Sequence, residues 1–356
     1  MDVGLCIGSK IDDIDYVVRA EQLGYSHAWF ADSQMIWSDV YACLAVAATR
    51  TTRIQLGTGV SIVGTRTAPV TAAAIATINR MAPGRTFLGV GNGHTAWRLM
   101  GQKPMPMADF EEYVRVVRGL LDGEETDYTL RGRTAKIKFD MAHLGYLDLE
   151  HHVPIYVSSF GPRGQAMAGK YGDGVVTAMA ADPAAVRSVW SNVLTGAKQV
   201  GRSVDRNKFL FCALTAACVL RAGEVLRSDR VVDTVGSMVI GGYHYTYDYI
   251  RNYGGEPPAF LADDWEEFSA LVEAVPETQR HRRIHIGHCT WLEPEERKFV
   301  TPERIAAACL VGSGPEIVEQ LHALESVGLG QVMLLPSLDK QYEALDDVSR
   351  EVLPKL

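Results

Sequence analysis

The sequence lacks the features that mark nucleic-acid-binding and membrane proteins. Its net charge is −8 and its longest basic run is RHRR at 280–283, so we expect no nucleic-acid partner. No apolar stretch reaches the roughly 18 residues that cross a bilayer. The N-terminus, MDVGLCIGSKIDD, has acidic residues where a signal peptide carries basic ones. These absences predict a cytoplasmic protein without a membrane partner.

The spacing of metal and nucleotide sites is also missing. The six cysteines are scattered without a C-x-x-C pair, which favours reduced core residues over disulfides or zinc ligands. No acidic cluster has divalent-metal spacing, and His285 and His288 have no carboxylate nearby in the sequence. The stretch GVGNG lacks the third glycine of a dinucleotide fingerprint, because His94 and Ala96 stand there. We therefore expect no metal and no Rossmann-type site.

Short apolar runs that alternate with amphipathic stretches are the main positive signal, and they are typical of β-α units around a parallel sheet. Helices are expected, from their glycine and proline end signals and apolar spacing, at Ile11–Leu23, Pro69–Met81, Asp109–Leu121 and Pro315–Val327. The eight strand candidates are Val3–Ile7, His27–Phe30, Ile54–Gly59, Thr86–Val90, Pro154–Val157, Gly174–Thr177, Phe209–Leu220 and Gln331–Leu335. Eight such units predict a (β/α)8 TIM barrel; because periodicity cannot show closure, a doubly wound open sheet is the alternative.

Two segments interrupt this rhythm and are expected as insertions in a single domain that spans residues 1–356. They are residues 123–153, after the fourth strand's helix, and residues 221–301, after the seventh strand. A segment that leaves the C-terminal end of a barrel strand lies on the active-site face. The second insertion, with the tyrosine-rich stretch 241–255, is therefore a candidate lid or substrate wall, and an oligomer interface is the alternative.

The C-terminal strand ends supply the candidate chemical groups of a barrel. Glycines at several of these ends predict a cavity with bare backbone, against which a planar ring can lie. The glycines of this predicted floor are Gly59, Gly91, Gly93 and Gly161. The other groups at the strand ends are Asp32, Ser33, Trp37, Asn92, His94, Ser158, Ser159, Arg163 and Thr177.

Several motifs in order resemble the luciferase-like flavin-dependent oxidoreductase superfamily of bacterial-luciferase type. Within it, they are similar to the branch of methylenetetrahydromethanopterin reductase and other enzymes that use the deazaflavin coenzyme F420. The motifs are WFADSQ, LGTGV, TAAAIATINRMAPGRTFLGVGNG, GQKPM, VPIYVSSFGP, YGDGVV and PEIVEQLHALESVGLGQVMLLP. They span most of the chain, and they are more specific for the family than for its substrate.

The resemblance implies roles for individual residues. A non-proline cis peptide at Gly59–Val60 is expected to form a bulge behind the ring, although the glycines would also suit a sharp turn. Asp32 and Ser33 match residues that meet the ring, and Trp37 matches an aromatic residue over the reacting centre. The remaining cofactor-binding positions are Asn92, Gly93, Ser158, Ser159, Gly161, Pro162 and Thr177, together with Arg163, which either supplements a phosphate site or is simply exposed at a helix start.

Two departures from the family pattern shape the expected chemistry. Ser33 stands where sugar-phosphate dehydrogenases of the family carry histidine, and His94 stands where they carry glutamate. Because an imidazole exchanges protons near neutral pH, His94 is the candidate general acid/base. A helix-capping or substrate-lining histidine is the alternative.

The expected activity is hydride transfer between coenzyme F420 and a small organic substrate, with Trp37 packed beside the reacting atoms. The alternatives are an FMN-dependent monooxygenase, which uses reduced FMN and oxygen, and a barrel that binds flavin without catalysis. A metal- or phosphate-dependent isomerase or aldolase is disfavoured, because its usual strand-end lysine or carboxylates are missing. The family resemblance also implies a homodimer that pairs through helices at 39–51 and 69–81.

Overall fold

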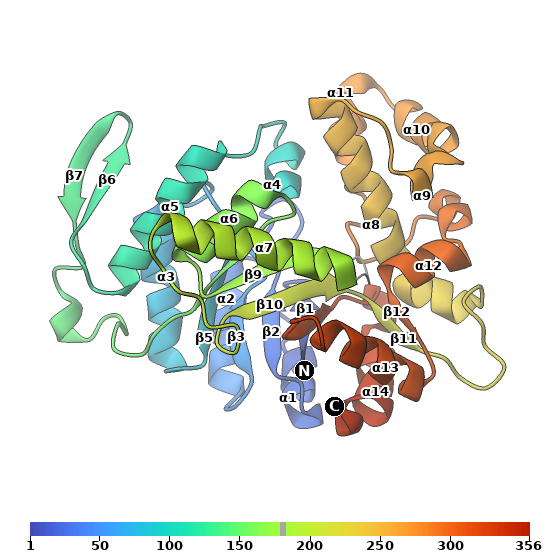
Figure 1. The fold of residues 1–356 in the computed structure, drawn as a ribbon, viewed down its shortest axis with the longest axis horizontal. Helices are drawn as coiled ribbons and strands as arrows, with labels where there is room; N and C mark the ends of the chain where they lie inside the picture. Colours follow the sequence, from blue (N-terminus) through green and yellow to red (C-terminus); the bar gives the residue numbers. More distant parts are fainter. Residues whose placement is uncertain (179–182) are drawn as a thin grey trace.

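The computed structural model describes residues 1–178 and 183–356, and its main feature is a closed barrel of eight parallel strands (Figure 1). Closure is direct, because the third barrel strand pairs with the fourth through Leu56 with Thr86 and Gly57 with Phe87. The predicted (β/α)8 barrel is therefore confirmed, and the open sheet is wrong. The barrel strands are β1 (Asp2–Ile7), β2 (His27–Phe30), β3 (Gln55–Thr58), β5 (Thr86–Gly91), β8 (Ile155–Ser158), β9 (Gly174–Ala178), β10 (Leu210–Thr215) and β13 (Gln331–Leu334).

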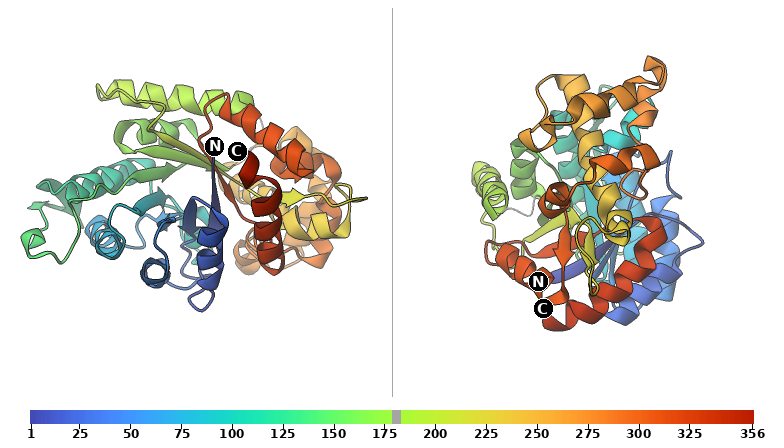
Figure 2. Two further views of the ribbon diagram at one scale, coloured as in Figure 1. Left: turned by 90° about the horizontal axis from the view of Figure 1, so that it is seen from below. Right: turned by 90° about the vertical axis from the view of Figure 1, so that its right-hand side faces the viewer.

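Helices cover the outside of this barrel (Figure 2). They are α1 (Asp15–Leu23), α2 (Val40–Arg50), α3 (Ala68–Met81), α5 (Met107–Leu121), α6 (Pro162–Tyr171), α7 (Pro183–Gln199), α13 (Gly314–Glu325) and α14 (Gln341–Glu351). Short 3-10 turns, η3 (Leu338–Lys340) and η4 (Leu353–Lys355), flank α14. Across the described part of the chain, none of the helices combines the length and the apolar character that a bilayer crossing requires.

Two predicted elements differ from the structure. The first helix begins at Asp15 instead of Ile11, because the carboxylate of Asp13 accepts hydrogen bonds from Gln341 and Tyr342 and holds the preceding residues in a turn. The expected strand Phe209–Leu220 is two strands. After β10, β11 (Ala217–Val219) leaves the barrel sheet and pairs with β12 (Leu310–Gly312), a partner that local sequence does not reveal.

A cluster around the rings of Trp29, Phe87 and Tyr156 fills the inside of the barrel, and a larger, mainly aliphatic cluster packs between strands and helices. The rings of Trp29 and Phe87 lie 4.3 Å apart between centroids, and Tyr156 lies 5.4 Å from Trp29. At the N-terminal end of β13, the Oε1 of Gln331 accepts a hydrogen bond from the indole N–H of Trp29 at 2.9 Å. The six cysteines are unpaired, and all but Cys289 are buried, as predicted for reduced core residues.

Both interruptions carry their own secondary structure and lie on opposite sides of the barrel in Figure 1. The first contains the hairpin of β6 (Thr126–Leu130) and β7 (Arg133–Ile137), followed by η1 (Ala142–Leu144). The second contains α8 (Asp229–Tyr253), α9 (Ala259–Ala262), α10 (Trp265–Glu273), α11 (Glu277–Arg283) and η2 (Pro294–Phe299), and α12 (Pro302–Ala308) follows it. The buried rings of Tyr243, Phe268 and Phe299 are the centre of its core.

Candidate functional site at the C-terminal mouth of the barrel

The chain makes a bulge immediately after β3, and the peptide bond between Gly59 and Val60 is cis, as predicted. A two-residue strand, β4 (Ser61–Ile62), follows the bulge. β3 pairs with the beginning of β5, at Thr86 and Phe87, and β4 pairs with its end, at Val90 and Gly91. The N–H of Val63 continues the ladder by donating to the carbonyl of Gly91 at 3.0 Å. Strand β5 therefore supports both sides of the cis bond.

The glycines around the bulge make room for its own side chains. A Cβ atom on Gly91 would lie 2.5 Å from a methyl group of Val60, and one on Gly93 would lie 2.4 Å from Ile62. A Cβ on Gly59 would lie 2.6 Å from the Cβ of Trp29. These three glycines are therefore required by the packing of the bulge, and their role as a bare floor for a ring stays a prediction. At the fourth, Gly161, no atom of the described residues other than its chain neighbours lies within 4 Å of an added Cβ.

Asp32 is buried and is bonded to the bulge. Its Oδ2 accepts the backbone N–H of Ile62 at 3.1 Å and a guanidinium N–H of Arg66 at 2.7 Å. Arg66 also donates to Asp39 at 2.9 Å and lies over the ring of Tyr41, 5.1 Å from its centroid. Burial lowers the pKa of Arg66, but the two carboxylates outweigh it and the pKa is raised. Sequence reasoning missed Arg66, because it lies 34 positions from Asp32 without a motif of its own.

His94 lies where β5 ends, at the first residue of the short helix α4 (His94–Leu99). Gly93 precedes it in the left-handed conformation, with φ of 65°. The amide of Asn92 donates to the carbonyl of Met105 at 2.8 Å, whereas its Oδ1 is buried without a hydrogen-bond partner among the described residues. The segment after β5 therefore carries an imidazole and, two residues before it, an acceptor without a partner among the described residues.

The environment of His94 favours the neutral imidazole. Burial lowers its pKa; the carboxylate of Asp248 opposes this effect, and the guanidinium of Arg98 adds to it. Arg98 on α4 and Asp248 on α8 form an ion pair of 3.4 Å, and both side chains are less than a tenth exposed. The ring of Tyr245, also on α8, lies 6.3 Å from the His94 ring. The long insertion thus packs directly against the helix that carries His94.

The two histidines of the insertion, His285 and His288, lie 6.0 Å apart between ring centroids. Burial is the main cause that lowers the pKa of His285 to about 2 and that of His288 to about 4. In residues 1–178 and 183–356, no three side chains of metal-binding type converge.

Ser33 and Trp37 lie after β2, in a turn in which the Ser33 carbonyl accepts the N–H groups of Ile36 and Trp37. The indole is half-buried and lies against Gly8, where an added Cβ would approach it to 3.1 Å. It also lines an open cleft of about 450 Å³ at the ends of β1, β2 and β13. Its role over a reacting centre stays a prediction.

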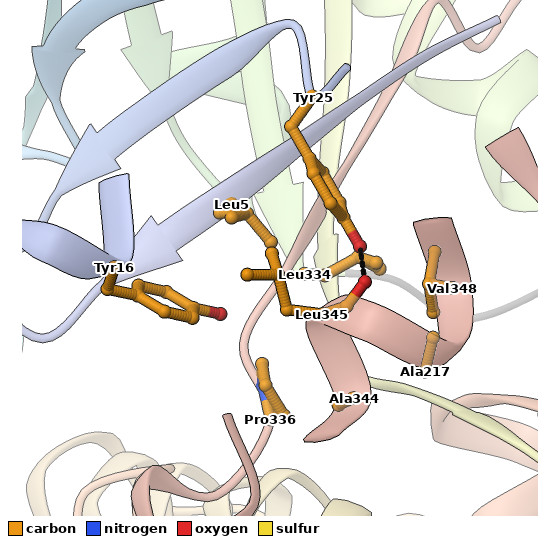
Figure 3. Close-up of a pocket in the computed structure, with 9 residues that line it drawn as sticks. All are labelled: Leu5, Tyr16, Tyr25, Ala217, Leu334, Pro336, Ala344, Leu345 and Val348. Atoms are coloured by element: carbon orange, nitrogen blue, oxygen red, sulfur yellow. Dashed lines mark hydrogen bonds between the residues drawn. The ribbon is translucent and has the colours of Figure 1, made fainter. Parts of the chain in front are cut away.

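A second hollow, shown in Figure 3, lies between β1, α1 and α14 and is too small for a ligand. Its volume is about 10 Å³, enough for about one water molecule. The hydroxyl of Tyr25 donates to the carbonyl of Leu345 across its wall at 2.8 Å. This hollow therefore belongs to the packing of the barrel's outer layer.

The other predicted residues lie at the ends of β8 and β9. Ser158 pairs with Gly91, and the Ser159 hydroxyl donates to the Gly161 carbonyl at 3.1 Å. Helix α6 follows, with Pro162 and Arg163 exposed in its first turn. Arg163 has no carboxylate partner within the described residues, so it is available to an anion at this helix start. Thr177, in β9, is nearly buried.

Comparison with known proteins identifies the family. Residues 11–331 match the luciferase-like monooxygenase family. The chain belongs to this family. A 5,10-methylenetetrahydromethanopterin reductase of Methanolobus tindarius is 35% identical to this luciferase-like chain over 250 residues, which are 70% of this chain and 72% of the relative. An F420-dependent glucose-6-phosphate dehydrogenase of Intrasporangium calvum is 26% identical over 361 residues, which cover 96% and 94% of the two chains.

The solved structures include a close match to this luciferase-like fold. The coenzyme F420-dependent tetrahydromethanopterin reductase from Methanopyrus kandleri superposes with a TM-score of 0.72 over 99% of each chain. Its sequence identity is 20%, so this match supports the fold. The sequence resemblance to the family is therefore confirmed.

Proposed function

We propose that this luciferase-like protein is an oxidoreductase that transfers a hydride between coenzyme F420 and a small organic substrate. The observation that carries the proposal is the combination, at the end of β5, of the cis bulge that pairs with this strand and of His94, whose pKa is lowered by burial at the barrel mouth. The relatives named as F420-dependent support the choice of coenzyme, because one of them matches 96% of this chain.

The residues at the mouth fit such a coenzyme. The buried Oδ1 of Asn92, which has no hydrogen-bond partner in residues 1–178 and 183–356, offers an acceptor, and the Gly59–Val60 bulge offers a backing surface. Among the described residues, Gly161 has open space where a Cβ would lie and Arg163 has no carboxylate partner, and both features suit an anionic side chain at the start of α6. Ser158, Ser159, Pro162 and Thr177 complete the proposed set. When bound, the deazaflavin supplies the hydride chemistry.

In this arrangement the protein's own groups position the substrate and move a proton. His94 holds or releases the proton that balances hydride transfer, at a substrate oxygen or nitrogen. Asp32 and Arg66 hold the bulge, while Tyr245 from the insertion covers His94 and limits its access to water. We therefore propose that the insertion is a substrate wall, in the same single domain as the barrel, with Ser33 and Trp37 lining the opposite rim.

Equilibrium titration with coenzyme F420 and with FMN, each oxidised and reduced, tests the proposal. We expect a preference for F420, together with oxidation of its reduced form by a substrate without oxygen. A preference for reduced FMN, with oxygen consumption, would instead indicate the monooxygenase chemistry in the family's name. Binding without turnover for any organic acceptor would leave a flavin-binding barrel.

We also propose that the protein is a cytoplasmic homodimer that pairs through α2 and α3. Exposed apolar residues support this face: Val70 and Met81 on α3, and Met141, Leu144 and Tyr146 on the segment beside it. That segment runs along α3, where the N–H of Asp148 donates to the carbonyl of Ala76 at 3.1 Å. Sedimentation that shows only monomer at micromolar concentration would contradict the dimer.

A further inference from the structure

Three tyrosines form an exposed stripe along α8, and the function proposed above does not use its outer part. Tyr245, Tyr249 and Tyr253 are 39%, 50% and 59% exposed, so exposure increases away from the barrel. Residues four positions apart share a helix face. At 1.5 Å of rise per residue, the first and last of them lie about 12 Å apart along the helix.

The stripe begins at the candidate active site. The ring of Tyr245 lies 6.3 Å from His94 and 5.3 Å from Phe160, edge-on to both. Tyr245 and Tyr249 are 6.5 Å apart with 29° between their planes, and Tyr249 and Tyr253 are 5.2 Å apart with 44°. The rings therefore form a continuous aromatic track from His94 to the end of α8.

The attachment of α8 to the protein uses other residues. Tyr243 and Tyr247 are buried against the core of the insertion and contact Trp265, while Asp248 pairs with Arg98 on α4. The stripe tyrosines make no hydrogen bond through their hydroxyl groups within the described residues. Their ring faces and hydroxyls are therefore available to a ligand.

We propose that the tyrosine stripe binds a planar, conjugated part of the substrate, while the reacting atom of the same molecule lies at His94. Tyrosine suits this role because it offers a rigid apolar face with a polar end. A ligand that uses both sites must extend about 10 Å beyond its reacting group, from the helical rise. The substrate class is therefore an elongated aromatic carbonyl or imine compound, in contrast to a short aliphatic one. The inference rests on the proposed function in placing the reacting atom at His94 and in requiring a hydride acceptor, a carbonyl or an imine.

Binding of two aldehyde probes without coenzyme tests the stripe directly. The probes are 4-phenylbenzaldehyde, which is planar and long, and propanal, which is short. We expect ligand-detected NMR to show binding of the biaryl probe, with affinity about tenfold lower in the double variant Tyr249→Ala/Tyr253→Ala, from the worth of aromatic contacts. The phenylalanine double variant should retain binding, and propanal should not distinguish the variants.

Phe260→Ala is the matched control, because Phe260 is 60% exposed on α9, outside both the stripe and the proposed dimer face. It should leave binding of the biaryl probe unchanged, and thermal melts should confirm that all variants fold. Equal affinity for wild type and the alanine double variant, or no binding to wild type, would overturn the proposal. A titration with coenzyme F420 tests the proposed function independently. No binding of coenzyme F420 would refute the proposed function, whereas weaker binding of the biaryl probe to the alanine double variant would still support the stripe.

Discussion

Replacing Asp248 with asparagine should weaken the attachment of α8 to α4. Asp248 and Arg98 form a buried pair in which Nε and Oδ2 are 3.4 Å apart, with side chains 8% and 9% exposed. Removal of one partner from such a pair costs about 3–5 kcal/mol, because the remaining charge stays buried. The 3.4 Å separation is longer than that of a strong charged hydrogen bond, and the Arg98 Nε makes no aligned hydrogen bond to any described residue. We therefore expect a loss of about 3 kcal/mol in the free energy of unfolding.

The same change should affect the ionisation of His94 in a direction that identifies the cause. Asp248 raises the pKa of His94 and Arg98 lowers it. Asp248→Asn should therefore lower this pKa further, whereas Arg98→Gln should raise it, although both variants lose stability. Titration of the His94 ring protons by NMR, with denaturant unfolding of each variant and of the double variant, measures both effects.

Arg251→Gln is the matched control on the same helix. The Arg251 guanidinium and the Glu277 carboxylate are 3.9 Å apart, and Glu277 is largely exposed. This ion pair should therefore contribute no more than about 1 kcal/mol to the free energy of unfolding. Shifts of the His94 pKa in the same direction in both test variants would refute the electrostatic explanation. A stability loss as small as that of the control would refute the assignment of a buried ion pair between α4 and α8.

Two further predictions concern packing and acid stability. Gly89→Ala should destabilise the protein by about 3 kcal/mol or more in thermal melts, because its Cβ would lie 2.1 Å from the Thr58 carbonyl oxygen. Gly161→Ala is the control: an added Cβ meets no atom of the described residues within 4 Å, so stability should change by less than about 0.5 kcal/mol. Equal effects of the two substitutions would contradict this account of the packing around the bulge. The hydrogen bond from Arg230 is the main cause that lowers the pKa of Glu224 to about 2, from 4.5 in the unfolded chain. The stability that the ionised Glu224 contributes is therefore present above pH 4.5 and is lost as the pH falls toward 2. Urea unfolding should therefore show Glu224→Gln less stable than wild type at pH 7 and nearly equal near pH 2, and a difference that is constant with pH would disprove the linkage.

The sequence by itself determined the eight strands and their alternation with helices, and it located the candidate groups at the C-terminal ends of the strands. Strand periodicity and the glycine and proline boundaries are local properties, so they located the eight strands and placed His94 at the end of one of them. The cis peptide at Gly59–Val60 was also predictable, but through family resemblance. These features could be predicted because each depends on residues that are close together in the sequence or on a motif shared with a known family.

The tertiary structure alone decided which distant groups meet. It paired Asp32 with Arg66, joined β11 to β12, and brought Tyr245 and Asp248 of the insertion to His94. It also showed that the glycines at the strand ends accommodate the bulge itself. Each of these contacts joins positions far apart in the chain, and the closure of the barrel together with the folding of the insertion brings them together. Periodicity and spacing contain no record of such contacts, because they describe only the residues within a few turns of each other.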